Sequence, residues 1–214
     1  MQAKTGLFKL FAGLVFMLTV ISLGSFAGFA EEEAASATNA ASTGGKELVI
    51  SDFDTGDKPN NIGGDFGAWD KDPNDDTQGT QMSFEPDDAL GDPAGYAVQF
   101  TYDVDSPNPA YNGFWMKLNG QDATGYNAIS FYLKGKGQFS KRVKIELKDM
   151  SNKPSPYMVT GITEEWKKFT IPFEKFRRIA DWSSLNEFVV VFDDINSSPK
   201  TGTIYLDQVA LTNQ

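Results

Sequence analysis

The chain has 214 residues, with 29 Asp and Glu against 19 Lys and Arg, a net charge of −10, and neither Cys nor His. Without Cys and His, the sequence excludes disulfides, zinc sites built on thiolates or imidazoles, and Ser-His-Asp catalysis. The negative charge argues against non-specific binding to nucleic acid or anionic membranes. Any bound metal is expected to be a hard, oxygen-ligated ion such as Ca²⁺.

Residues 1–30 have the pattern of a secretory signal peptide. Lys4 and Lys9 are followed by the apolar stretch Leu10–Leu23, and Gly28-Phe29-Ala30 supplies the small residues of a cleavage site. Charged, apolar and small residues in this order are typical of signal peptides. The alternative is an uncleaved anchor, because the segment is just long enough to span a bilayer. We expect a protein that is secreted or periplasmic, with no stable membrane insertion after cleavage.

The remaining sequence divides into a linker and one domain. Residues 31–46 are mostly small and polar and predict a flexible linker. Residues 47–214 contain short runs of alternating apolar and polar residues, separated by Gly, Pro, Asn and Asp, which predict antiparallel strands. The predicted strands are Glu47–Phe53, Gln81–Phe84, Tyr96–Tyr102, Gly113–Leu118, Ala128–Lys134, Arg142–Asp149, Tyr157–Val159, Lys167–Pro172, Glu187–Asp193 and Gly202–Thr212. Their regular spacing favours an all-β jelly-roll β-sandwich.

The first long loop of this domain carries aromatic and acidic residues. Phe66 and Trp69 flank glycines and are expected to cover one end of the sandwich. The segment Asp70–Asp76 resembles a calcium loop, but it does not fit the EF-hand pattern. Counted from Asp70, the sixth and twelfth positions hold Asp75 and Gln81 instead of Gly and Glu. A calcium site of another kind and a solvated acidic loop both remain open.

Three aromatic side chains fall on the polar face of their own predicted strands. The neighbours of Tyr111, Trp115 and Tyr132 at alternate positions are apolar and face inward, so these rings face outward. Large rings are costly to expose unless they meet a partner, and their flat faces match the C–H faces of sugar rings. The alternative is that a loop or the linker covers them. The polar groups expected beside them are Arg142, Lys144 and Glu146.

Five stretches of the sequence, in this order, resemble carbohydrate-binding modules of family 11 and their relatives, which include the mitochondrial complex I intermediate-associated proteins. The stretches are Leu48–Gly56 (LVISDFDTG), Asn60–Gly64 (NNIGG), which is followed by Trp69, Tyr126–Lys134 (YNAISFYLK), Glu165–Phe173 (EWKKFTIPF) and Gly202–Asp207 (GTIYLD). The resemblance covers residues 47–213 and implies a galactose-binding-like jelly roll. It also implies a structural calcium ion between the first and last strands, where the nearest carboxylates are Asp52, Asp54 and Asp207.

The resemblance also implies a ligand and a face that binds it. In such modules a β-glucan chain lies along a concave sheet lined by tyrosines and charged groups. In this chain Tyr111, Trp115 and Tyr132 would stack on the sugar rings, but Trp115 and the acidic segment Asp70–Asp76 depart from the family pattern. The hydroxyl partners would be Arg142, Lys144, Glu146 and Asp193, with Tyr157 as a further candidate.

Three functional hypotheses follow. The first is an exported, non-catalytic domain that binds a β-linked polysaccharide of the β-glucan class on the aromatic face. The second is a protein-interaction or assembly domain of the complex I intermediate-associated type, with an envelope protein as its partner. The third is a glycoside hydrolase, which needs two carboxylates about 5–10 Å apart. Glu146 with Asp193 or Asp194 is the pairing that we consider for it, and we rank this hypothesis last.

Overall fold

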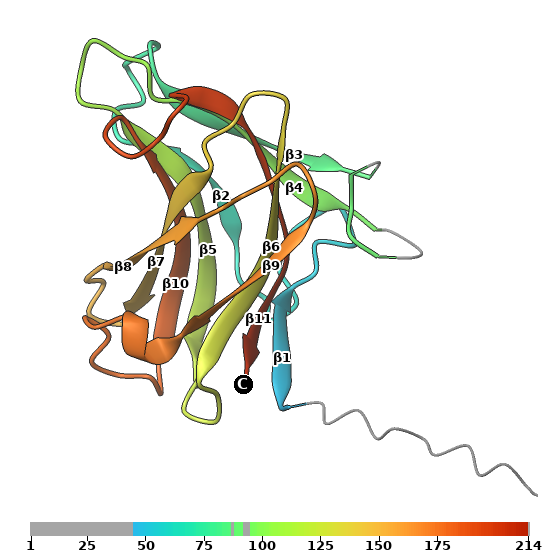
Figure 1. Cartoon of the computed structure of the whole chain (residues 1–214). Coiled ribbons are helices and arrows are strands. Elements are labelled where there is room, and N and C mark those ends of the chain that lie inside the picture. Colours follow the sequence, from blue (N-terminus) through green and yellow to red (C-terminus); the bar gives the residue numbers. More distant parts are fainter. Residues whose placement is uncertain (1–44, 87, 92–94, 214) are drawn as a thin grey trace, which may run out of the picture. The chain divides into compact units, whose positions relative to one another are not determined.

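The computed structural model describes residues 45–86, 88–91 and 95–213 (Figure 1). Within these ranges it contains eleven strands and one 3₁₀ turn. The elements are β1 (Glu47–Ser51), β2 (Phe66–Asp70), β3 (Gly79–Glu85), β4 (Ala97–Asp103), β5 (Tyr111–Gln121), β6 (Ala128–Lys136), β7 (Arg142–Asp149), β8 (Ser155–Thr160), β9 (Lys167–Pro172), η1 (Phe173–Lys175), β10 (Leu185–Asp193) and β11 (Thr201–Thr212). No helix in these ranges is long and apolar enough to cross a membrane. The predicted signal peptide, residues 1–30, and all but the last two residues of the predicted linker lie outside the described residues.

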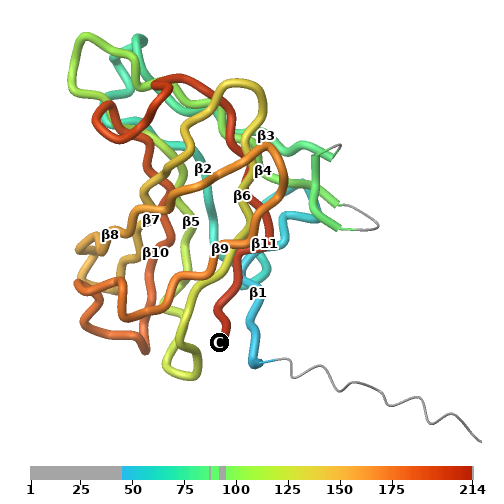
Figure 2. The backbone as a smooth tube through the Cα atoms, in the orientation of Figure 1, coloured from blue at the N-terminus to red at the C-terminus, as the bar shows by residue number. Residues whose placement is uncertain are grey.

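The strands form two antiparallel sheets that pack face to face (Figure 2). Sheet A has the strand order β3-β4-β11-β6-β9, and β1 pairs with the second half of β11. Sheet B has the order β2-β5-β10-β7-β8. Consecutive strands along the chain often lie in different sheets, so the sheets are linked by connections that cross between them. This architecture confirms the predicted all-β sandwich.

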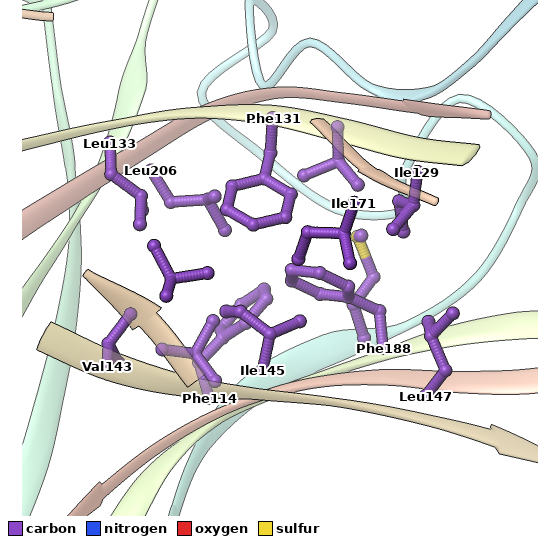
Figure 3. Packing of buried hydrophobic residues seen from close by; sticks show 14 of the residues in the cluster. Phe114, Ile129, Phe131, Leu133, Val143, Ile145, Leu147, Ile171, Phe188 and Leu206 are labelled. Atoms are coloured by element: carbon purple, nitrogen blue, oxygen red, sulfur yellow. The ribbon is translucent and has the colours of Figure 1, made fainter. Parts of the chain in front are cut away.

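Aromatic and aliphatic side chains from both sheets fill the space between them (Figure 3). Phe100 of β4 and Phe114 of β5 have ring centroids 5.0 Å apart, and Phe131 of β6 and Phe188 of β10 have centroids 5.6 Å apart. All four rings are fully buried. Each buried aromatic side chain contributes about 1.5–3 kcal/mol by leaving water. The inward face of each sheet is therefore used by the core and is closed to a ligand.

One strand, β2, was not predicted from the sequence. Phe66 and Trp69 were expected in a loop because glycines and acidic residues surround them. In the structure they belong to β2, which pairs with β5 along its whole length. Phe66 enters the core and contacts Phe114. Burial of Phe66 and pairing with β5 override the weak strand propensity of the local sequence.

The outward face of sheet A is partly covered by the connection between β3 and β4. Asp88 in this connection forms ion pairs with Lys134 and Lys136 of β6, at 2.7 and 2.8 Å. The backbone N–H of Leu90 donates to the carboxylate of Asp207 on β11, at 2.9 Å. As a result Asp207 is fully buried although it lies on the outward side of its strand. We call this side of the sandwich the covered face.

Candidate functional site

The outward face of sheet B carries a cross-strand row that spans all five strands. Gly67 of β2 pairs with Trp115 of β5, which pairs with Val189 of β10. Val189 pairs in turn with Glu146 of β7, which pairs with Pro156 of β8. Trp115 and Val189 lie outside the core cluster, whereas their neighbours along the strands are part of it. This row therefore points away from the core, and we call the surface to which it belongs the open face.

A second, parallel row runs beside the first one. It consists of Trp69 of β2, Gly113 of β5, Val191 of β10, Lys144 of β7 and Met158 of β8. Val191 is only 6% exposed although it faces outward. Side chains from β5 and β7 must therefore stand over the central strand β10. The open face thus has an aromatic side on β2 and β5, an aliphatic floor on β10, and a charged side on β7.

Three aromatic rings gather on the aromatic side of the open face. Tyr111 and Trp115 flank Gly113 on β5, and Trp69 lies opposite Gly113 on β2. The ring centroids of Trp69 and Tyr111 are 5.9 Å apart, and Tyr111 is 43% exposed. The amino group of Lys117 lies 5.6 Å from the centre of the Trp115 ring. We call the rings of Trp69, Tyr111 and Trp115 the aromatic platform.

Each tryptophan of the aromatic platform pairs with a glycine on the neighbouring strand. Trp115 lies opposite Gly67, and Trp69 lies opposite Gly113. A Cβ atom at Gly67 would lie 3.6 Å from the Trp115 ring, which is ordinary van der Waals contact. A Cβ atom at Gly113 would approach the carbonyl oxygen of Val190 to 2.0 Å, so only glycine fits there. The two glycines leave space for the indole rings at the surface of the sheet.

The indole N–H of Trp69 has no partner among the described residues. Its Nε1 atom is inaccessible to solvent and makes no hydrogen bond. Such a buried donor costs about 1–3 kcal/mol when it is left unsatisfied. Trp69 therefore lies on the open face at a cost in folding stability.

Ion pairs order the charged groups of the open face. Glu187 of β10 accepts hydrogen bonds from Lys117 of β5 and Lys148 of β7. Burial alone would raise the pKa of Glu187, but the hydrogen bonds from the two lysines outweigh it and lower that pKa below its usual value. Lys144 forms an ion pair with Asp193 at 2.8 Å. The carboxylates of Glu187 and Asp193 are therefore held in place as hydrogen-bond acceptors.

Glu146 differs from the other carboxylates of the open face. It makes no hydrogen bond and no ion pair with any of the described residues. Burial raises its pKa above the usual value, against the attraction of Lys144 and Lys148 on the same strand. Its neighbours across the strands, Val189 and Pro156, are apolar. Glu146 is thus the one carboxylate of the open face, among the described residues, whose oxygens are unused by the protein.

Two of the residues predicted for the site lie elsewhere. Tyr132 is on β6, paired with Asp207, and therefore belongs to the covered face of sheet A. Tyr157 pairs with the inward-facing Ile145 and packs on Phe176, with ring centroids 6.3 Å apart. The prediction that Tyr132 joins Tyr111 and Trp115 on one face is wrong, and Tyr157, the further candidate for ligand binding, does not lie on the open face. The other predicted residues share the open face: Tyr111, Trp115, Arg142, Lys144, Glu146 and Asp193.

The sequence of this domain matches a known protein family. The family model "Carbohydrate binding domain 30" matches residues 60–213, which is most of the chain. The chain belongs to this family. A search of curated proteins finds no match. The family differs in number from the one that the sequence motifs resemble, but it is likewise a family of carbohydrate-binding modules.

Solved structures show the fold that this carbohydrate-binding domain shares. One is the family 11 carbohydrate-binding module of the cellulosomal cellulase Lic26A-Cel5E of Clostridium thermocellum, with a TM-score of 0.58 and 19% identity. The match covers 79% of this chain and 95% of that module. Another is a family 11 module from Clostridium thermocellum in complex with a β-1,3-1,4-mixed-linked tetrasaccharide, with a TM-score of 0.58, 17% identity and coverage of 78% and 95%. An exo-β-agarase also matches, with a TM-score of 0.57 and 10% identity, over 78% of this chain and 25% of the enzyme.

The calcium ligands suggested by the family resemblance lie around the last strand of the domain. Burial, together with the nearby charges of Asp54 and Asp52, raises the pKa of Asp207 to about 7, although hydrogen bonds from backbone N–H groups act in the opposite direction. Three carboxylates that repel one another are chemically suited to a hard cation. Among the described residues, however, no group of three or more acidic side chains is arranged so that it could hold a metal ion. The donor chemistry of this carbohydrate-binding domain therefore fits calcium, but the present arrangement does not bring three carboxylates to one point.

Sequence reasoning missed several residues of the open face. Trp69 was placed in a loop, and Gly67, Lys117, Lys148 and Glu187 were not singled out. The alternation in Phe66–Asp70 was a usable signal for Trp69, because Phe66 and Trp69 fall on opposite faces of a strand. For the lysine and glutamate residues the signal was weaker, since charged residues are common on the polar side of any strand.

Proposed function

We propose that the open face of this carbohydrate-binding domain binds a neutral β-linked glucan and does not cleave it. The observation that carries the proposal is the gathering of Trp69, Tyr111 and Trp115 on the outward face of sheet B, beside ordered carboxylate–lysine pairs. Flat rings suit the C–H faces of sugar rings. Ordered charged groups suit sugar hydroxyls, because hydrogen bonds to ionised groups are stronger than neutral ones.

The β-glucan class is supported by chemistry and by one relative. Most charged groups of the open face pair with one another, Glu187 with Lys117 and Lys148 and Asp193 with Lys144, and this supports a neutral ligand over a charged one. The family 11 module with the same fold binds a β-1,3-1,4-mixed-linked tetrasaccharide. We infer that this domain takes a ligand of the same class. The signal-peptide pattern of residues 1–30 supports export, where such polysaccharides are met.

A hydrolase is disfavoured by the positions of the carboxylates. Glu146 pairs with Val189, which is four residues from Asp193 on β10. At about 3.4 Å per residue, the two backbones are separated by about 14 Å along the strand. Glu187 is nearer to Glu146, but its two oxygens are bound by Lys117 and Lys148. A glycoside hydrolase needs two free carboxyl groups about 5–10 Å apart. The positions of these carboxylates do not meet that requirement, and they support binding without cleavage.

Affinity electrophoresis with a pair of tyrosine variants tests the proposal. We expect soluble β-1,3-1,4-glucan to retard the wild-type domain, and the Tyr111→Ala variant to lose most of this retardation. Tyr132→Ala provides the matched control, because it removes the same side chain from the covered face. It should be retarded like the wild type. If no polysaccharide in a panel of β-glucans, xylan and an α-glucan retards the wild type, the proposal is wrong.

The same panel separates a glycan from a protein partner. A domain that binds an envelope protein through the open face would not be retarded by any polysaccharide in the panel. No observation on the open face favours that alternative over sugar binding.

We further propose that calcium binds beside Asp207, where the buried carboxyl group and the nearby charges of Asp52 and Asp54 support a cation although the three side chains do not converge on one point in the present structure. We expect saturating Ca²⁺ to raise the melting temperature of the purified domain by several degrees, because a ligand of the native state stabilises it by mass action. EDTA should reverse the rise. Asp207→Asn should abolish the response, while Asp122→Asn, in an exposed turn, should keep it. An identical melting curve with Ca²⁺ and with EDTA would contradict calcium binding by this domain.

A further inference from the structure

A hollow at one end of the sandwich has the same kind of lining as the open face. It has a volume of about 540 Å³ and is bounded by the β5–β6 connection, the start of η1 and the segment before β10. Its lining includes Thr124, Tyr126, Phe173, Glu174 and Trp182. None of these residues belongs to the cross-strand rows of sheet B. Figure 1 shows the β5–β6 connection and η1 at the same end of the two sheets.

Aromatic rings form the apolar part of this end hollow. Phe173 and Trp182 stack with ring centroids 4.0 Å apart and an interplanar angle of 12°. Phe173 is buried, whereas Trp182 is half-buried, so Trp182 presents the pair to solvent. Tyr126 is also half-buried, and the amino group of Lys46 lies 4.5 Å from the centre of its ring. The end hollow therefore offers an indole and a phenol ring to a ligand.

The end hollow is held in shape by the backbone. The N–H of Ala123 donates to the carbonyl of Trp182 at 2.8 Å. The N–H of Phe173 donates to the carbonyl of Asn127, also at 2.8 Å. These bonds tie the three segments that line the hollow to one another. A site whose walls are already ordered loses less entropy when a ligand binds.

The polar part of the lining lies at the rim. Thr124 and Glu174 are exposed, and they bring a hydroxyl group and a carboxylate to the edge of the aromatic floor. The volume is in the range that proteins use for small ligands, about 300–1,000 Å³. Flat rings below and hydrogen-bonding groups at the rim are the same combination that makes the open face suitable for sugars.

We infer that the end hollow is a second saccharide site, which takes a short neutral β-glucan oligosaccharide or the end of a chain. The inference rests on the proposed function of the open face for its class of ligand. The open face admits a chain that passes over it, whereas the end hollow is confined by loops. Two sites on one domain would let it hold two glucan strands, and would favour polysaccharide over oligosaccharide by multivalency.

The four tryptophans of the chain allow a test of each site separately. Trp69 and Trp115 report on the open face, Trp182 reports on the end hollow, and Trp166 lies on the covered-face side, where it donates to Asp88. A β-1,3-1,4-linked tetrasaccharide is titrated into the ¹⁵N-labelled domain, and the four indole N–H signals are followed by NMR. We expect the indole signal of Trp182 to shift during the titration, with a dissociation constant separate from that of the open face. The signal of Trp166 should stay unchanged.

Two variants make the outcome decisive. In Trp115→Ala the shift of Trp182 should persist, because the end hollow does not depend on the open face. In Thr124→Arg, which places a large side chain at the exposed rim without touching the stacked rings, the shift of Trp182 should be lost while that of Trp115 remains. The inference is overturned if Trp182 does not shift, if its shift disappears in Trp115→Ala, or if Trp166 shifts equally. A silent Trp115 beside a shifting Trp182 would instead overturn the proposal for the open face.

Discussion

Replacing Trp115 by alanine is expected to weaken binding of soluble β-1,3-1,4-glucan by about 30-fold or more. Trp115 belongs to the aromatic platform and lies on the open face between Gly67 of β2 and Val189 of β10. Removal of an aromatic anchor from a binding surface costs about 2 kcal/mol or more, and each 1.4 kcal/mol corresponds to a tenfold change in Kd. Isothermal titration calorimetry measures the loss directly.

The fold should survive this substitution, because Trp115 points away from the core. An unchanged melting temperature would show that lost binding is not lost folding. Trp166→Phe is the matched control, since it alters a tryptophan just before β9, on the covered-face side, and keeps an aromatic ring there. It should bind the glucan within about twofold of the wild type. Wild-type affinity in Trp115→Ala would exclude the aromatic platform as the binding surface.

Replacing Asp149 by alanine is expected to lower the free energy of unfolding by about 3 kcal/mol, because buried donors that lose a charged acceptor are costly. Asp149 ends β7 and is only 2% exposed. Its carboxylate accepts the N–H of Ser151 at 2.8 Å, that of Ala180 at 2.9 Å and that of Asp181 at 3.2 Å. It thereby ties the turn after β7 to the segment before β10. Urea unfolding at pH 7 measures the change.

The contribution of Asp149 should also depend on pH. Hydrogen bonds from the Ser151 hydroxyl and from the Ala180 N–H lower the pKa of Asp149 to about 2. Since this is below the value of about 3.9 in an unfolded chain, the stabilisation is complete above about pH 4 and is lost as the pH falls toward 2. The difference between wild type and Asp149→Ala should therefore shrink on acidification.

Asp122 offers a matched comparison for this measurement. Its carboxylate accepts the N–H and hydroxyl of Thr124 in the same turn geometry, but in an exposed position. Asp122→Ala should cost clearly less than Asp149→Ala, because its donors can bond to water instead. Equal losses in the two variants would show that burial of Asp149 is not what makes its turn important.

Much of the fold could be predicted from the alternation of residues. The bounds of β7 and β9 agree with the sequence prediction, because each reads as an uninterrupted strand between turn signals. The strand β2 could not be predicted in this way. Its sequence contains Gly67 and ends in the acidic segment, and it is a strand because β5 pairs with it and Phe66 enters the core.

The candidate site shows a sharper limit of sequence reasoning. Alternation tells which way a side chain faces relative to its own strand, and in this sense Tyr111, Trp115 and Tyr132 all face outward. It does not tell which sheet the strand joins. Tyr132 belongs to sheet A and the other two to sheet B, so they point in opposite directions from the sandwich. Trp69 takes the place that was expected for Tyr132.

The glycine opposite Trp115 has a consequence for how the determinants of binding can be found. Gly67 has no side chain to remove, so a scan that shortens each residue to alanine would pass over it. An added methyl group fits at 3.6 Å from the indole and would change little. A branched or aromatic side chain at this position would instead push the indole away from the sheet. The shape of the open face is thus set in part by the absence of a side chain at Gly67, and only enlarging substitutions would reveal this.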